Sequence, residues 1–83
     1  MVNINDLNER IGFTDLALAS FLSIQFPIIE LKTENGIKFE FVFLDSSELQ
    51  KAISDFYSNK AQVNPLAYFN AIKNLKGRLY SER

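Results

Sequence analysis

The sequence predicts an α+β fold in which a two-stranded antiparallel β-hairpin packs on three helices, in the order α-β-β-α-α. An Asn-Gly pair separates two apolar, β-favouring runs over residues 28–44, which is a strong hairpin signal. Apolar residues before and after that stretch recur at helical spacing. Eighty-three residues suit one domain, so we expect a flexible arm over residues 1–12 and one globular unit over residues 13–83.

The alternation of side chains predicts how the hairpin pairs, because residues opposite each other share a face of the sheet. A two-residue loop formed by the Asn-Gly pair places Lys32 opposite Phe39 and mixes charged with apolar side chains. A three-residue loop, Glu34-Asn35-Gly36, places Leu31 opposite Phe39 and separates the two kinds. We therefore expect the three-residue loop, with its glycine at the left-handed position.

Residues 14–25 are predicted to form the first helix, with Thr14 as its N-cap and Pro27 preventing its continuation. No charged side chain occurs from residue 16 to residue 29, so apolar groups surround nearly the whole helix. A helix of this kind is buried on most sides. It is either the central core helix or an interface between protein molecules. The candidate interface residues are Leu18, Ser20, Phe21, Ser23 and Ile24.

Two more helices are expected after the hairpin. Asp45 is the predicted N-cap of the second helix, because Glu48 follows at the spacing of a capping box. Asn64 and Pro65 have the residue types of an N-cap and a first helical position, so they begin the last helix. Gly77 is a weak point in that helix. The predicted buried stripe of the last helix consists of Tyr68, Ala71, Ile72, Leu75 and Leu79.

Composition argues against most catalytic chemistry. The chain has no cysteine and no histidine, which removes the thiol nucleophile and the commonest general base and metal ligand. Helix capping explains Asp45 and Glu48, and Asp55 lies two turns further on, so the three acids do not predict a Mg²⁺ site. We expect no enzyme activity, no cofactor, no metal and no small-molecule substrate. The sequence shows no signal peptide and no membrane-spanning run, so the expected location is the cytoplasm.

Charge is distributed unevenly along the chain. Residues 1–59 hold nine acidic and four basic residues, a net charge of −5, and residues 60–83 hold five basic and one acidic residue, a net charge of +4. Either this asymmetry marks a binding face or the two parts balance within one small fold. Aromatic and basic residues interleave on a flank of the last helix, where phosphates meet ammonium groups and bases stack on rings. The candidates for nucleic-acid contact are Phe69, Lys73, Lys76, Arg78 and Tyr80.

Four sequence motifs together carry a resemblance to a known family. They are residues 14–22 (Thr-Asp-Leu-Ala-Leu-Ala-Ser-Phe-Leu), 41–45 (Phe-Val-Phe-Leu-Asp), 63–65 (Val-Asn-Pro) with Tyr68, and 75–80 (Leu-Lys-Gly-Arg-Leu-Tyr). Over residues 13–80 the chain resembles a small family described only as a domain of unknown function and scattered through bacterial, archaeal and phage genomes. The resemblance implies a small stand-alone protein, often of phage or mobile-element origin, and it implies no activity, cofactor or catalytic residue.

Two functions remain as alternatives. The first is a non-enzymatic protein-interaction module of phage or mobile-element origin that docks on an unidentified protein partner. Such a module is expected to be a homodimer that uses its hairpin edge or its uncharged helix. The alternative is an auxiliary nucleic-acid-binding protein that uses the basic and aromatic flank of its last helix. Neither function involves a membrane.

Overall fold

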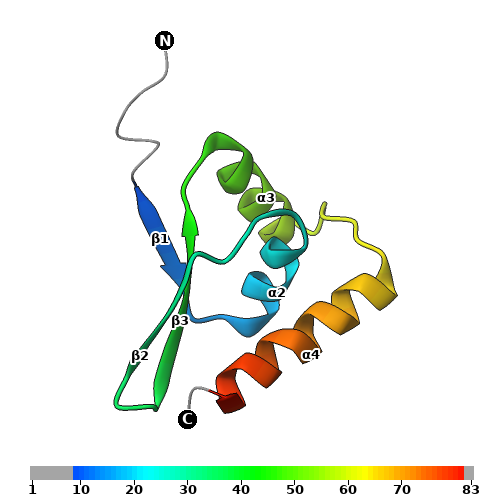
Figure 1. Ribbon diagram of the computed structural model, residues 1–83. Coiled ribbons are helices and arrows are strands. Elements are labelled where there is room, and N and C mark those ends of the chain that lie inside the picture. Colours follow the sequence, from blue (N-terminus) through cyan, green and yellow to red (C-terminus); the bar gives the residue numbers. More distant parts are fainter. Residues whose placement is uncertain (1–8, 82–83) are drawn as a thin grey trace.

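A computed structural model describes residues 9–81 and contains one sheet and three helices (Figure 1). The elements are β1 (Arg10–Phe13), α2 (Leu16–Gln25), β2 (Glu30–Glu34), β3 (Lys38–Leu44), α3 (Ser47–Tyr57) and α4 (Pro65–Ser81). The predicted α+β class with antiparallel strands and three helices is confirmed. The predicted number of strands is wrong, because the sheet has three strands in the order β1-β3-β2. No helix within residues 9–81 is long and apolar enough to span a membrane.

The additional strand, β1, lies in the segment predicted to be a flexible arm. It pairs antiparallel with β3, with Gly12 opposite Val42 and Phe13 opposite Phe41. Gly12 suits this position, because a Cβ there would collide with the side chain of Glu40. The prediction of an arm is therefore wrong for residues 10–12, and residues 1–8 lie outside the described residues. With β1 in place, β3 is hydrogen-bonded on both sides and becomes the central strand.

The hairpin of β2 and β3 differs from the predicted one by two residues. Leu31 lies opposite Phe41, where Phe39 was expected, and the three-residue turn is Asn35-Gly36-Ile37. Asn35 and Gly36 have φ of 58° and 68°, the combination found in a type I′ turn. A shift of two residues keeps every side chain on its predicted face, so the separation of apolar from charged residues holds in both registers.

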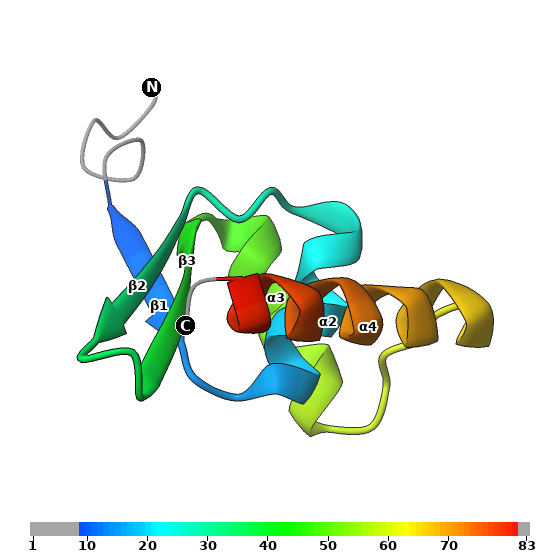
Figure 2. The same ribbon diagram turned by 60° about the horizontal axis from the view of Figure 1, so that its bottom comes forward.

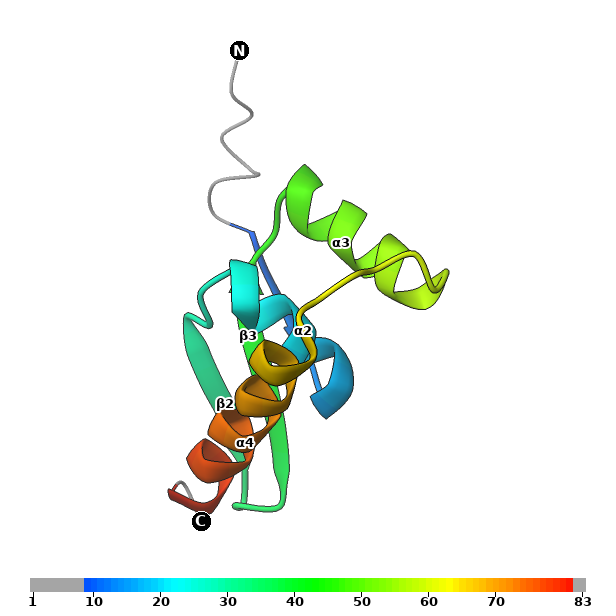
Figure 3. The same ribbon diagram turned by 90° about the vertical axis from the view of Figure 1, so that its right-hand side faces the viewer.

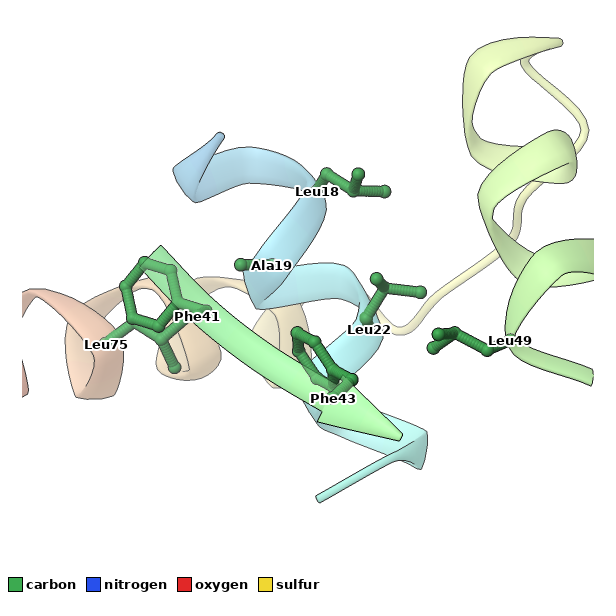
Figure 4. Close-up of a cluster of buried hydrophobic side chains, with 7 residues drawn as sticks. All are labelled: Leu18, Ala19, Leu22, Phe41, Phe43, Leu49 and Leu75. Atoms are coloured by element: carbon green, nitrogen blue, oxygen red, sulfur yellow. The ribbon is translucent and has the colours of Figure 1, made fainter. Parts of the chain in front are cut away.

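The core forms where α2 meets the sheet. All three helices lie on one face of the sheet, and α4 lies beside α2 with its C-terminal end directed toward the hairpin (Figures 1 and 3). Figure 4 shows side chains from β3, α3 and α4 gathered around α2. Of the two alternatives for this uncharged helix, the central core helix is the one observed. The core cluster consists of Leu18, Ala19, Leu22, Phe41, Phe43, Leu49 and Leu75.

Side-chain caps fix where each helix begins. The carboxylate of Asp15, and not Thr14, caps α2 and accepts hydrogen bonds from the amides of the second and third helical residues, at 2.9 and 3.3 Å. Ser46 caps α3 in place of the predicted Asp45, and its Oγ accepts from the amide of Leu49 at 3.0 Å. Asp45 instead accepts from the amide of Ser46 at 2.8 Å. Each correction is one position, because neighbouring Asp, Ser and Thr residues are all good caps.

Helix α4 begins as predicted and continues further than its glycine indicated. The side chain of Asn64 accepts hydrogen bonds from the amides of Leu66 and Ala67, at 2.9 and 3.0 Å. The helix passes through Gly77 without interruption and reaches Ser81. It is anchored to α2 by the hydroxyl of Tyr68, which donates to the carbonyl oxygen of Ala17 at 3.1 Å. The predicted buried stripe is confirmed, since all five of its residues are buried or half-buried.

The core position of α2 leads to a stability prediction. Leu22 is fully buried, so Leu22→Ala should lower the free energy of unfolding by about 2–5 kcal/mol, because it leaves a cavity. Ile37 at the hairpin turn is 80% exposed, and Ile37→Ala should change that free energy by less than about 0.5 kcal/mol. Urea denaturation measures both variants. A small change in both would contradict the placement of α2 in the core.

Candidate functional site

The predicted protein interface on α2 does not form a surface. Leu18 is 1% exposed and Ser20 is completely buried, so neither can touch a partner, and the prediction is wrong for both. Phe21 is half-buried and its ring lies 5.5 Å from that of Phe56 on α3, centroid to centroid. Only the last part of the set reaches the surface, where Ser23 is half-buried and Ile24 is 40% exposed.

Four of the five candidate nucleic-acid contacts do lie together, on one side of α4. Leu66, which was not among the predicted residues, lies in the same row. The five residues are separated by three, four, three and four positions, which is the spacing of a straight row on a helix. Leu66, Phe69 and Tyr80 are 67%, 58% and 68% exposed, and both lysines are exposed. We call this row the basic-aromatic stripe. It consists of Leu66, Phe69, Lys73, Lys76 and Tyr80.

The stripe has internal contacts that order part of it. The Nζ atom of Lys73 lies 5.5 Å from the centroid of the Phe69 ring, within the range of a cation–π interaction, worth about 0.5–1 kcal/mol at an exposed site. Toward the C-terminal end, Lys76 and Tyr80 line a hollow of about 410 Å³. Its opposite wall is the hairpin, through Ile37 and Phe39, and Figure 2 shows the red end of α4 directed toward that hairpin. The stripe therefore ends in a partly apolar hollow.

Arg78, the fifth candidate, lies away from the stripe and lines a groove on another side of α4. This groove has a volume of about 400 Å³ and runs between α4 and the segment that joins α2 to β2. Asn70, Asn74 and Arg78 line it from α4, and Ser23 and Ile24 line it from α2. We call it the amide groove. It brings together two of the predicted interface residues, one predicted nucleic-acid contact and two asparagines that were not among the predicted site residues.

The charge of α4 is of one sign. The helix holds Lys73, Lys76 and Arg78 and no acidic residue. The two ion pairs found among residues 9–81 are Arg10–Glu30 and Lys51–Asp55, each at 3.2 Å, and neither involves a cation of α4. Both surfaces of α4 therefore favour an anionic partner.

A further hollow lies elsewhere, where β3 meets α3. It has a volume of about 620 Å³ and is lined by Phe26, Leu44, Asp45 and Glu48, among others. Asp45 within it is hydrogen-bonded to the amide of Ser46 and to the side chain of Gln50, at 2.8 Å each. Its acids serve the start of α3, and within residues 9–81 no group of three or more metal-ligating residues occurs.

Comparison with known proteins assigns the chain to a family. The family described as a domain of unknown function (DUF5659) matches residues 8–81. The chain therefore belongs to this family, and the resemblance to an uncharacterised domain family that the sequence motifs carried is confirmed. No curated protein and no solved structure matches the chain.

Proposed function

We propose that this member of the DUF5659 family is a non-enzymatic interaction module that docks on an acidic protein surface through its basic-aromatic stripe. The observation that carries the proposal is the exposure of three large apolar side chains, Leu66, Phe69 and Tyr80, in one row with two lysines. Large apolar side chains exposed together on one side of a helix are typical of docking sites, and aromatic residues are enriched in the centres of protein interfaces.

The composition of the stripe favours an acidic partner over a second copy of the same helix. If two α4 helices paired through their stripes in antiparallel orientation, Lys73 would lie close to its own counterpart. The neighbouring Lys76 adds a second cation to each helix, and neither helix offers an acid. Like charges that face each other across an interface are unfavourable. A partner with carboxylates flanking an apolar centre satisfies both the lysines and the exposed rings.

One observation favours nucleic acid as a second candidate for the same surface. The rings of Phe69 and Tyr80 alternate with two lysines along the stripe, and bases stack on exposed rings while phosphates contact ammonium groups. The aliphatic Leu66 and the small number of cations favour protein. An isoelectric point of about 5.3 also argues against a general DNA-binding protein.

We propose that the expected homodimer forms through an edge of the sheet, because α2 is buried in its own chain. In the described chain β1 and β2 pair on one side only, and unpaired strand edges can join another chain. β2 carries Glu30, Lys32 and Glu34, and charges of this kind oppose edge pairing, so β1 is the edge that we propose for the dimer.

We predict that the stripe binds an acidic helical peptide with glutamates flanking a row of leucines. Phe69→Ala should weaken that binding about thirtyfold, the effect of removing a central aromatic anchor worth about 2 kcal/mol. Tyr57→Ala removes an aromatic side chain that is 63% exposed on α3 and is the matched control, expected to bind normally. Fluorescence anisotropy measures both. Equal losses in the two variants, or no binding of the peptide by the wild-type chain, would overturn the proposal.

The same assay with a labelled single-stranded oligonucleotide tests the second candidate. Two lysine–phosphate contacts predict a slope of about −1.4 in log affinity against log salt, a loss of about sevenfold between 50 and 200 mM. Lys73→Glu with Lys76→Glu should abolish the binding, whereas Lys51→Glu with Lys60→Glu makes the same change of net charge away from the stripe and should weaken it less. Absence of oligonucleotide binding at low salt eliminates this candidate and leaves the protein module.

We predict a mass of two chains in solution at micromolar concentration, measured by light scattering. Because the stripe lies on α4 and the proposed dimer edge lies on β1, the dimer and the docking site are independent. A mass of one chain would contradict the dimer without affecting the stripe.

A further inference from the structure

The amide groove has a polar row on one wall and an apolar wall opposite. Asn70, Asn74 and Arg78 are spaced four positions apart, so they form one row along α4, with one turn of helix between successive members. The other wall is apolar and comes from α2 and the segment after it. Buried Ala71 and Leu75 form the floor, and Figure 3 shows α2 and α4 beside each other. The apolar wall consists of Ile24, Phe26, Pro27 and Ile28.

The polar row has unused hydrogen-bonding capacity. Within residues 9–81 the side chains of Asn70, Asn74 and Arg78 take part in none of the side-chain hydrogen bonds or ion pairs. A primary amide carries both a donor and an acceptor, and a guanidinium carries only donors. The row can therefore offer two donor–acceptor pairs followed by one cationic group, next to an apolar surface.

The spacing of this row matches an extended peptide. Residues four apart on a helix are separated by about 6.0 Å along its axis, and alternate residues of an extended strand are separated by about 6.6–6.8 Å. The side-chain amide of Asn70 can thus pair with the backbone N–H and C=O groups of one residue of a strand. The side-chain amide of Asn74 can pair with the same groups two residues further along that strand. Over the two steps to Arg78 the mismatch reaches only about 1.5 Å. A helical ligand keeps its backbone groups in its own hydrogen bonds and cannot offer them to the two amides.

We infer that the amide groove binds an extended peptide segment of a partner protein, with its backbone on Asn70 and Asn74 and an acidic side chain on Arg78. Among residues 9–81, Arg78 is the only charged residue that lines the groove, so charge complementarity selects an acidic residue at that end. A guanidinium pairs with a carboxylate through two parallel hydrogen bonds. Side chains on one face of the bound strand would contact Ile24. This site lies on a different side of α4 from the basic-aromatic stripe and goes beyond the function proposed for it.

The test uses the full chain and a synthetic hexapeptide of alternating valine and threonine that ends in aspartate, acetylated and amidated so that the aspartate supplies the only carboxylate. Titration followed by ¹H–¹⁵N NMR should shift the side-chain amide signals of Asn70 and Asn74. Arg78→Gln should weaken the binding of this peptide about tenfold, the effect of one charge-assisted pair. The same substitution should leave the affinity for a peptide with asparagine in place of aspartate unchanged. Asn74→Ala should weaken the binding of both peptides severalfold.

The matched control is Lys73→Gln, which removes a cation of α4 from the stripe and should change the binding of either hexapeptide by less than about twofold. These expectations do not depend on whether the basic-aromatic stripe binds the acidic helical peptide. Failure of one proposal can therefore be told apart from failure of the other. The inference is wrong if millimolar peptide shifts the side-chain amide signals of neither asparagine. It is also wrong if Lys73→Gln weakens peptide binding as much as Arg78→Gln does.

Discussion

The burial of one uncharged helix is the constraint on which the rest of the structure depends. No charged residue occurs in α2, and Leu18 and Leu22 are almost fully buried. Removing such a side chain from water contributes about 1.5–3 kcal/mol, so the chain gains most by covering α2 on several sides. β3 covers one side with two phenylalanines, and α3 and α4 each contribute a leucine. The cover is complete enough to bury the hydroxyl of Ser20, which has no hydrogen-bond partner among residues 9–81.

The position of α4 follows from this burial, and both proposed binding surfaces follow from the position of α4. One face of the helix packs on α2 through Ala71 and Leu75, and the hydroxyl of Tyr68 anchors the same face to the backbone of α2. The remaining sides of the helix are left to solvent. One side carries the basic-aromatic stripe, and the other faces the end of α2 and closes the amide groove. A single helix thus combines a structural face with two separate surfaces of positive charge.

Local chemistry made several elements predictable. Asn64 before Pro65 is a strong helix-start signal and is confirmed, and the alternation of side chains placed every hairpin residue on its observed face. The register was wrong because a shift of two residues preserves that alternation. β1 was missed because a strand of four residues has too short a pattern to recognise, and it becomes stable only by pairing with β3, more than 25 positions away.

For the candidate sites too, local spacing was predictable from the sequence and contacts between distant parts of the chain were not. The spacing along α4 correctly placed Phe69 and Lys73 on one exposed row. Arg78 lies on another side of the helix, and no pattern in the sequence indicates what it faces there. That depends on the segment from Phe26 to Ile28 lining the same groove as α4, although the two parts of the chain are at least 39 positions apart. The interface expected on α2 was wrong for Leu18 and Ser20 for a related reason, because an apolar surface can be covered by its own chain or by another, and composition does not distinguish the two.

Hydrogen exchange of the α2 backbone amides tests the central claim most directly. If α2 is the core of a single chain, the amides from Leu18 to Leu22 should be among the slowest in the protein and should exchange only through global unfolding. They should keep this protection in a sample diluted until light scattering shows the mass of one chain, because the residues that cover α2 belong to the same chain. Rapid exchange of these amides in the single chain would instead mean that a second copy covers the helix, and the account given for α2 and α4 would be contradicted.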